Sequence, residues 1–201
     1  SILFLLLLFC YTASFAQPVE NGHVANAFND YKQAILNDKA EDALKAVDSR
    51  TKKYYTGILQ DVKLADSLRI DSLPLIDKIT ILRIRSAASK PEIESMQGTD
   101  AFLFAIRNGM VGKSSVAGNE LGEIIIEENF AKGQLVAAGQ KTDYYFHYYK
   151  EEGQWKMDIT SLFAIANMAF EQMVKESGEE ENKYLVSLLE LLSGKSIAAD
   201  I

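Results

Sequence analysis

Residues 142–160 read TDYYFHYYKEEGQWKMDIT and carry the strongest structural signal in the chain. Two aromatic, strand-like segments flank a Glu152-Gly153 turn, and the second segment ends at a Thr160-Ser161 helix-start signal. This arrangement predicts a β-hairpin followed by a helix. An aromatic hairpin face must pack against apolar surface, so the stretch also predicts a hydrophobic core beneath it.

Helical patterns precede the hairpin, and a strand-rich region surrounds it. Apolar spacing predicts a helix over 24–36 and a long second helix that opens with an Asp38/Glu41 capping box and continues to Val62. A third helix is predicted from Pro74, although the β-branched run ITILRI at 79–84 leaves a strand as the alternative. The remaining predicted elements are short helices at 92–96 and 100–108, strands at 121–127, 130–137, 142–151 and 154–159, and helices at 162–175 and 183–192.

Helices first and an antiparallel meander second predict an α+β fold. We expect N-terminal helices packed on a curved antiparallel sheet, with additional C-terminal helices closing the chain. No segment after Asn21 has the composition of a flexible linker, and no internal repeat is visible. Residues 17–201 are therefore expected to form a single domain.

The first residues, SILFLLLLFCYTASFAQ, have the pattern of an export signal. The apolar run at 2–9 is too short to span a bilayer, and the small residues Ser14 and Ala16 fit the cleavage rule of a secretory signal peptide. We predict a signal peptide over 1–16 and an exported protein, periplasmic or extracellular. The alternative is a lipoprotein signal with Cys10 as the lipidated residue, which the large Phe9 disfavours. Cys10 is the only cysteine, so no disulfide is expected in the mature protein.

Charge and residue spacing disfavour several functional classes. The net charge is −7 and the basic residues are scattered, whereas nucleic-acid binding needs a basic face. Only His23 and His147 are present, without zinc spacing, and we expect no metal site and no cofactor. The segment at 107–114 resembles the end of a phosphate loop, but Arg107 replaces the first glycine and the segment follows a helix. No catalytic residue is predicted.

The hairpin register determines which side chains share a face. A two-residue turn pairs Lys150 with Trp155 and Tyr148 with Met157, whereas a three-residue loop with Gly153 left-handed would mix the faces. We prefer the two-residue turn because it gives the cleaner apolar face. One face then carries Tyr144, Phe146, Tyr148, Trp155, Met157 and Ile159. The other carries Tyr145, His147, Tyr149, Lys156 and Asp158.

The order of helices followed by a curved meander resembles the nuclear-transport-factor-2-like (SnoaL-like) cone fold. The residues that carry the resemblance are Tyr148-Tyr149-Lys150 and the strand at 153–158, GQWKMD, with a weaker likeness around 77–79 and 82–85 to secreted bacterial members. The resemblance spans about 24–163 and implies a ligand pocket on the concave side of the sheet. It also implies that the protein dimerises through its sheet. If the protein is an enzyme, the resemblance implies catalysis by Asp, Tyr and His residues buried within the cone.

The first hairpin face is the expected concave side. With a pocket there, Tyr144, Tyr148 and Trp155 would line it and offer hydroxyls and an indole N–H to a ligand. The alternative, which we favour, is that these side chains fill the core with their polar tips satisfied.

The second face would expose Tyr145, His147 and Tyr149 together with Asp158. Clustered surface aromatics often mark a protein–protein contact, so these residues form a candidate interface, and a homodimer is one expectation. His147 lies opposite Asp158 and could act as an oriented base, but a surface cross-strand pair is the favoured interpretation.

We therefore expect an exported, non-catalytic domain that binds a small apolar ligand or a protein partner. One alternative is an isomerase- or dehydratase-like enzyme that uses Tyr and Asp residues of the cone pocket. Another is a structural dimeric component of the envelope. This fold hosts binders and enzymes alike, so the fold does not separate these functions.

Overall fold

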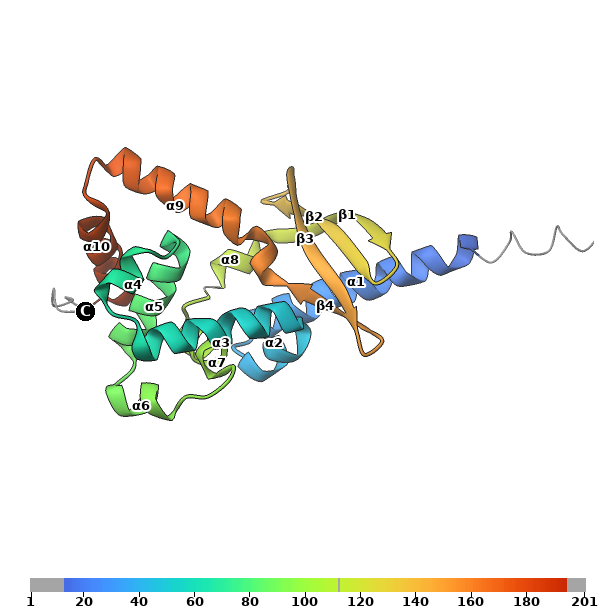
Figure 1. Cartoon of the computed structure of the whole chain (residues 1–201). Coiled ribbons are helices and arrows are strands. Elements are labelled where there is room, and N and C mark those ends of the chain that lie inside the picture. Colours follow the sequence, from blue (N-terminus) through green and yellow to red (C-terminus); the bar gives the residue numbers. More distant parts are fainter. Residues whose placement is uncertain (1–12, 112, 195–201) are drawn as a thin grey trace, which may run out of the picture.

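A computed structural model of the chain describes residues 13–111 and 113–194 and has an α+β fold (Figure 1). The first half is helical: α1 Ala13–Leu36, α2 Ala40–Ala46, α3 Ser49–Leu64, α4 Ser67–Asp71, α5 Leu75–Ala87, α6 Lys90–Ser95, α7 Asp100–Arg107 and α8 Ser114–Ala117. The strands β1 Asn119–Glu127, β2 Phe130–Ala137, β3 Gln140–Glu151 and β4 Gln154–Asp158 follow. A 3₁₀ turn η1 Ile159–Leu162 and the helices α9 Phe163–Ser177 and α10 Glu181–Ser193 complete the described chain.

The four strands form one open antiparallel sheet in the order β1-β2-β3-β4. Two of its connections are two-residue turns, Ala138-Gly139 and Glu152-Gly153, and all four turn residues have positive φ, from 50° to 77°. Such turns match the right-handed twist of the strands that they join. The strand expected over 142–151 therefore starts two residues earlier, because Gln140 already belongs to β3.

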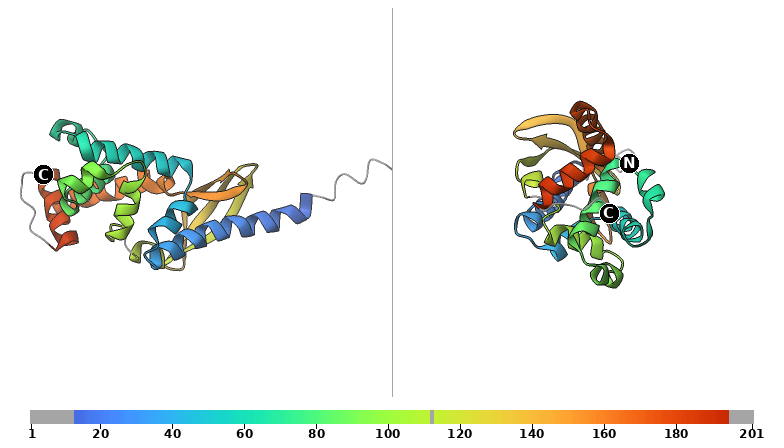
Figure 2. Two further views of the ribbon diagram at one scale, coloured as in Figure 1. Left: turned by 90° about the horizontal axis from the view of Figure 1, so that it is seen from below. Right: turned by 90° about the vertical axis from the view of Figure 1, so that its left-hand side faces the viewer.

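Helix α1 crosses one face of the sheet and contacts both β1 and β4 (Figure 2). Its apolar stripe includes Val24, Phe28 and Tyr31, each at most 5% exposed. The ring of Phe28 lies 5.8 Å from that of Phe146 on β3. Gly133 allows close packing on this face, because an added Cβ would lie 2.5 Å from a methyl group of Leu121, and that side chain would have to move. The core predicted beneath the hairpin is therefore the α1–sheet interface.

Helix α5 shows why the ITILRI run forms a helix. Leu75 and Ile79 pack against Leu185 of α10, whereas Ile81 and Ile84, both 0% exposed, belong to the main core. Two opposite helix faces are thus buried, so the apolar residues do not form a single stripe and the helical period is hidden in the sequence. The helical prediction from Pro74 is confirmed, since α5 begins at Leu75.

An ion pair anchors α10 on α5. The ammonium group of Lys78, whose side chain is 8% exposed, lies 2.6 Å from Glu181 in the first turn of α10. A buried ammonium without a partner would be costly, so this contact fixes where α10 begins.

The long helix expected from Asp38 to Val62 is wrong, because the chain breaks between α2 and α3. Val47 and Asp48 are extended, and Val47 forms a parallel bridge with Met157 of β4. The Asp48 backbone N–H donates to the Met157 carbonyl at 3.0 Å, and the Asp48 carboxylate accepts from the Thr51 N–H at 2.9 Å. Aspartate is a preferred N-cap, and here it starts α3.

The capping box expected at Asp38 and Glu41 does not form. Asp38 has a φ of 56° and its carboxylate pairs with Lys113 at 2.6 Å, while Glu41 pairs with Arg107. Helix α2 begins after Lys39, which makes no side-chain cap. Both acidic residues therefore bind cations from the segment at 107–113 instead of backbone N–H groups.

Most of the expected signal peptide, including Cys10, lies outside the described residues. Helix α1 begins at Ala13, and the expected cleavage position after Ala16 falls in its first turn. The helix predicted over 24–36 ends at Leu36 as expected and starts earlier.

We predict that Asp48→Ala lowers the free energy of unfolding by about 2 kcal/mol, because a fully buried N-cap carboxylate and its hydrogen bond are lost. The matched control is Asp66→Ala, since Asp66 caps α4 at 2.8 Å but is exposed, and its loss should stay below about 1 kcal/mol. Urea unfolding followed by circular dichroism measures both. Equal losses would contradict a special role for the α2–α3 corner.

Candidate functional site

The hairpin has the predicted two-residue register. Lys150 pairs with Trp155, Tyr148 with Met157, and His147 with Asp158. Alternate residues of β3 therefore point toward α1 or away from it. The two faces have different surroundings, and we describe them in turn.

Tyr148 lies in the core on the inward face. Its side chain is 0% exposed, and burial raises the pKa of its hydroxyl well above the ordinary value. Within the described residues the hydroxyl oxygen has no hydrogen-bond partner. Tyr148 thus fills space between the sheet and α1, but the expectation of a satisfied polar tip does not hold.

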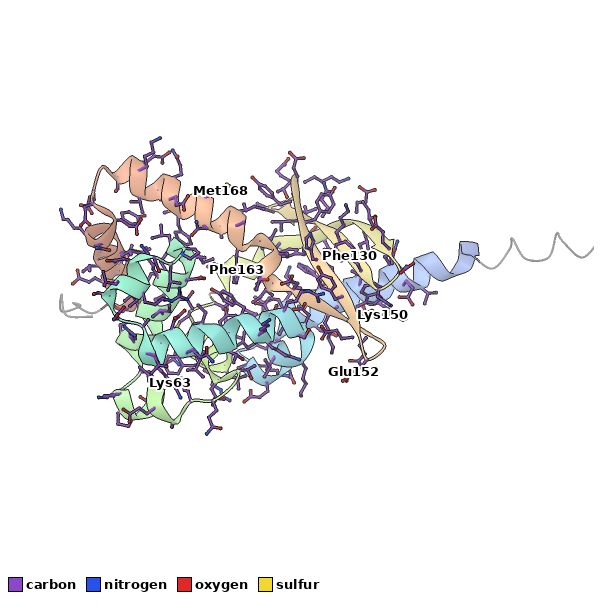
Figure 3. The ribbon with its side chains drawn as sticks, in the orientation of Figure 1. Lys63, Phe130, Lys150, Glu152, Phe163 and Met168 are labelled. Atoms are coloured by element: carbon purple, nitrogen blue, oxygen red, sulfur yellow. The ribbon has the colours of Figure 1, made fainter. Side chains whose placement is uncertain are left out.

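Trp155 is also buried, at 5% exposure, and its polar group is already bound. The indole N–H donates to the Glu20 carboxylate at 2.6 Å, and the Lys150 ammonium lies 3.1 Å from both oxygens of that carboxylate (Figure 3 labels Lys150). The hydrogen bond from Trp155 and then that from Lys150 lower the pKa of Glu20. These contacts fasten α1 to the hairpin, so the indole N–H is not free to orient a ligand.

Tyr144 departs from the expected inward face. The pairing of β2 with β3 shifts between Gln134 and Val136, opposite this part of β3, and the Tyr144 side chain is 45% exposed. A bulge of this kind rotates the following side chains relative to the sheet. The three residues expected to line one pocket, Tyr144, Tyr148 and Trp155, are therefore not gathered around a common space.

The outward face carries an aromatic–cation cluster, defined here as Arg50, Phe130, Lys132, Tyr145, His147 and Tyr149. The Phe130 ring lies 5.2 Å from both His147 and Tyr149. The Arg50 guanidinium lies 3.4 Å above the Tyr149 ring, and the Lys132 ammonium lies 5.9 Å from Tyr145. Figure 3 shows Phe130 in the strand region, clear of the helices at the other end of the molecule. All these rings are partly exposed.

Asp158 does not join this cluster, contrary to the sequence-based expectation. Its side chain is 5% exposed and accepts from the Thr160 N–H at 2.9 Å and from the Thr160 hydroxyl at 2.6 Å. The chain turns into η1 at this residue, and the carboxylate caps the turn. Within the described residues no hydrogen bond joins Asp158 to the His147 ring, so they do not form an oriented acid–base pair.

A carboxyl–phenol pair that the sequence did not indicate joins α3 to α5. The Tyr54 hydroxyl donates to Asp77 at 2.5 Å, and its ring lies 5.0 Å from Phe163 at the start of α9 (Figure 3 labels Phe163). Burial raises the pKa of the Asp77 carboxyl, and the bond from Tyr54 acts in the opposite direction without cancelling it. The pair packs between helices, and we assign it a structural role.

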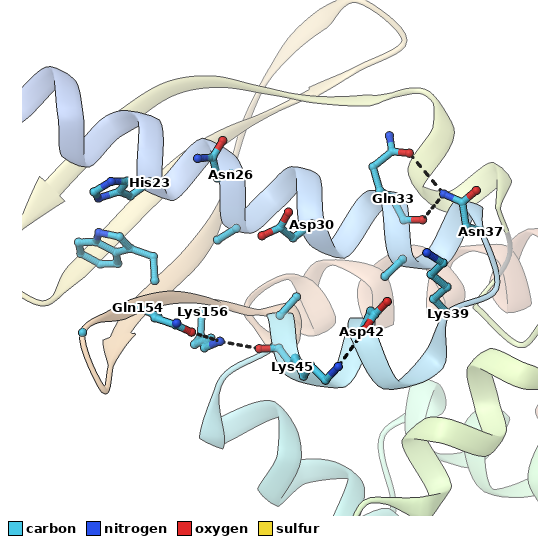
Figure 4. Close-up of a pocket in the computed structure, with 15 residues that line it drawn as sticks. His23, Asn26, Asp30, Gln33, Asn37, Lys39, Asp42, Lys45, Gln154 and Lys156 are labelled. Carbon is cyan, nitrogen blue, oxygen red and sulfur yellow. Dashed lines mark hydrogen bonds and ion pairs between the residues drawn. The ribbon is translucent and has the colours of Figure 1, made fainter.

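A polar groove lies between α1, α2 and the β3–β4 hairpin (Figure 4). It has a volume of about 660 Å³. The walls carry amide and charged side chains, and the floor includes Ala27, Ala34 and Ala46. Of the three residues expected to line a pocket, only Trp155 belongs to its lining, and the sequence did not indicate the remaining residues, which come from distant segments.

Comparisons with models of protein families, with curated proteins and with solved structures find no match for this chain. Among residues 13–111 and 113–194, no group of three or more His, Cys, Asp or Glu side chains is placed to hold a metal ion. In the same part of the chain, no helix combines the length and apolar character needed to cross a membrane.

We predict that Tyr148→Phe raises the free energy of unfolding by about 1 kcal/mol, because it removes a buried hydroxyl that has no partner. The control, Tyr54→Phe, deletes a hydrogen bond to a carboxylate and should cost about 2 kcal/mol. Chemical denaturation of the two variants gives both values. A clear loss for Tyr148→Phe would mean that its hydroxyl is bonded after all.

The raised pKa of Asp77 predicts a pH-dependent effect of Asp77→Asn. The native state binds this proton more tightly than the unfolded chain, whose ordinary pKa is 3.8, so the contribution of Asp77 to stability is full at lower pH and is lost as the pH rises through the raised value. Asparagine keeps an acceptor for Tyr54 and cannot ionise. Relative to the wild type, the variant should therefore gain stability as the pH rises from acid to neutral.

Unfolding free energies measured across this pH range test the effect, with Asp71→Asn as the control for replacing an exposed aspartate. A pH-independent difference for Asp77→Asn would contradict the raised pKa.

Proposed function

We propose that this chain is an exported, non-catalytic interaction domain of the nuclear-transport-factor-2-like type, which self-associates through the outward face of its sheet. The observation that carries the proposal is the aromatic–cation cluster. Phe130, Tyr145 and Tyr149 have partly exposed rings on the outward face of the sheet, whereas α1 crosses the other face (Figure 2). Aromatic residues and arginine are the types enriched in protein interfaces.

Side chains fill the inward face of the sheet, which favours a binding site on the outer surface over one between the sheet and α1. A small apolar ligand, or a substrate for an isomerase- or dehydratase-like reaction, would need space between the sheet and α1. Phe28, Phe146 and Tyr148 occupy that region with exposures of at most 9%. An interaction domain, including a dimeric structural component of the envelope, requires no such space.

Charge on the outward face supports a second copy of the chain as the partner. A cross-strand row runs from Glu127 through Phe130 to Tyr149, and Arg50 stacks on Tyr149 at its far end. Glu127 makes no ion pair within the described residues, and Arg50, which lies 3.3 Å from the buried Asp48 carboxylate, has a side chain that is 51% exposed. A two-fold axis parallel to the strands and lying between the two faces would place the Glu127 end of one copy over the Arg50 end of the other. Such an interface is self-complementary in charge.

The sequence supports the remaining parts of the proposal. The apolar run at 2–9 and the small residues Ser14 and Ala16 favour export, and cleavage after Ala16 would leave Glu20 in place to bind Trp155. The GQWKMD strand at 153–158 supports the family assignment.

We predict that the wild type runs as a dimer at tens of micromolar in size-exclusion chromatography with light scattering, and that Tyr145→Ser/Tyr149→Ser is monomeric. Removing two interface rings deletes most of the apolar contact. The control is Leu191→Ser, which removes an apolar side chain that is 80% exposed on α10 and should leave the mass unchanged. Circular dichroism verifies that each variant is folded.

Charge reversal tests the two-fold arrangement itself. Glu127→Arg and Arg50→Glu should each weaken the dimer, and the double variant should restore it, because each reversed charge again meets an opposite one across the interface. Arg50→Glu also removes the ion pair with Asp48, so circular dichroism must show that this variant is folded. A monomeric wild type, or an unchanged mass for the tyrosine double variant, would overturn the proposed interface.

A further inference from the structure

Helix α9 is apolar on both of its long sides, although it packs on the protein with only one of them. On the inward side, Phe170 and Val174 contact the apolar cluster that α5 shares with α10. Asn167, the one polar residue among 163–170, lies on this side too, where its amide oxygen accepts from the Ile76 N–H at 3.1 Å. No side chain of α9 is buried in the described structure.

The outward side of α9 carries two neighbouring rows of side chains. Residues four apart lie along one ridge of a helix, so one row is Ala164, Met168 and Gln172, and the other is Ile165, Ala169 and Met173. Met168 is 59% exposed and Met173 is 46% exposed, and Figure 3 labels Met168 on α9. A surface helix usually presents polar residues on the side opposite the core. Here five of the six side chains are apolar, so α9 exposes a second apolar side.

The two rows are complementary in size when one of them is reversed. A second α9 that lies antiparallel to the first brings the row 164–168–172 beside the row 165–169–173 of the second copy. Ala164 then lies next to Met173, and Met168 lies next to Ala169. Each methionine fills the space that an alanine leaves, as in the packing of helix ridges into grooves. A two-fold axis between positions 168 and 169 produces all of these contacts at once, so the surface is complementary to itself.

Charge along α9 favours the same antiparallel arrangement. The first charged residue of the helix is Glu171, and the others, Lys175 and Glu176, also lie in its C-terminal half. In an antiparallel pair, the charged half of each helix lies over the uncharged half of the other. A parallel pair would instead place like charges side by side, with Glu176 beside Glu176. The dipoles of two antiparallel helices also oppose each other, which is the favourable orientation.

Other partners fit this side of α9 less well. Helices that lie on a membrane surface are rich in lysine and arginine around their apolar side. Lys175 is the only cation of α9, and the chain has a net charge of −7. A small ligand needs a concave site, whereas the side of a helix is convex. The self-complementary rows therefore favour a second copy of the chain as the partner.

We propose that α9 is a second self-association surface, on which two copies pack their helices antiparallel with Met168 beside Ala169 of the second copy. The inference does not rest on the proposed sheet contact, because α9 and the aromatic–cation cluster use different side chains. A single pair of helices buries a small area, and small interfaces are weak and transient, so we expect a dissociation constant of about 0.5 mM. The contact should therefore join sheet dimers into larger assemblies only in concentrated protein.

The test is sedimentation equilibrium of the Tyr145→Ser/Tyr149→Ser variant, which lacks the rings of the sheet contact, from about 20 µM to about 2 mM. Its mass should rise from that of a monomer toward that of a dimer. Adding Met168→Glu should raise the dissociation constant about tenfold, because a charge would be buried against apolar side chains. The matched control is Leu68→Glu on α4, which introduces the same charge at a side chain that is 78% exposed and should leave the association unchanged.

A compensating pair of substitutions in the same background tests the register of the helices. Met168→Ala should weaken the association severalfold, because it leaves a gap beside Ala169 of the second copy. Adding Ala169→Met should restore the association, because each methionine again lies beside an alanine. Both positions are exposed, and circular dichroism verifies that the variants are folded.

Three results would overturn the inference. The first is a mass that stays monomeric over the whole concentration range, and the second is equal weakening by Leu68→Glu, which would reflect general repulsion between acidic proteins. The third concerns a tyrosine variant that already dimerises in dilute solution, a result that would overturn the sheet contact. Loss of that dimer on adding Met168→Glu would then support α9 as the contact, whereas an unchanged dimer would overturn both surfaces.

Discussion

The corner between α2 and α3, where Val47 pairs with Met157 on the free edge of β4, is the contact on which the rest of the arrangement depends. It joins the helical part of the molecule to the sheet through backbone groups, with the Asp48 N–H donating to Met157. The Ile159 N–H donates to the Thr51 hydroxyl at 3.2 Å, and Glu151 accepts from the backbone and hydroxyl of Ser49. Burial acts to raise the pKa of Glu151, but the bonds from Ser49 and the nearby cations outweigh it, so that the pKa lies below its ordinary value.

The outward surface and the groove both depend on that corner. Helix α2 precedes the corner and forms one wall of the groove. Arg50 follows the corner and stacks on the Tyr149 ring. A free edge strand invites unwanted pairing, and here the corner covers the edge of β4. One backbone junction therefore protects the sheet, shapes the groove and completes the aromatic–cation cluster.

Local signals predicted much of this structure. The strand at 130–137 and the hairpin register are as the residue pattern indicated, because each depends on the alternation of side chains or on a turn residue with positive φ. The break at Asp48 was missed, since the apolar stripe continues through it and only the β4 contact makes an extended Val47 favourable. An Asp-Ser-Arg-Thr run with an N-cap aspartate was the available signal.

The site was less predictable than the fold because it depends on tertiary contacts between distant segments. Face alternation correctly separated Tyr148 from Tyr145 and Tyr149. It did not predict that Tyr144, beside a shift in register, is 45% exposed, or that Asp158 is buried where the chain enters η1. The groove and the Tyr54–Asp77 pair depend on contacts between segments far apart in sequence. Such contacts produce no periodic pattern in the sequence, so these residues are seen to be neighbours only in the tertiary structure.

The central claim is that the sheet has a filled inner face and a recognition surface outside. Fluorine NMR of the fluorotyrosine-labelled protein, with a soluble paramagnetic agent, tests it most directly when recorded from dilute to concentrated samples. The account predicts that the Tyr148 resonance is protected throughout, while those of Tyr145 and Tyr149 broaden in dilute protein and become protected on concentration. The account would be contradicted if the paramagnetic agent broadened the Tyr148 resonance. It would also be contradicted if the broadening of the Tyr145 and Tyr149 resonances were the same at every protein concentration.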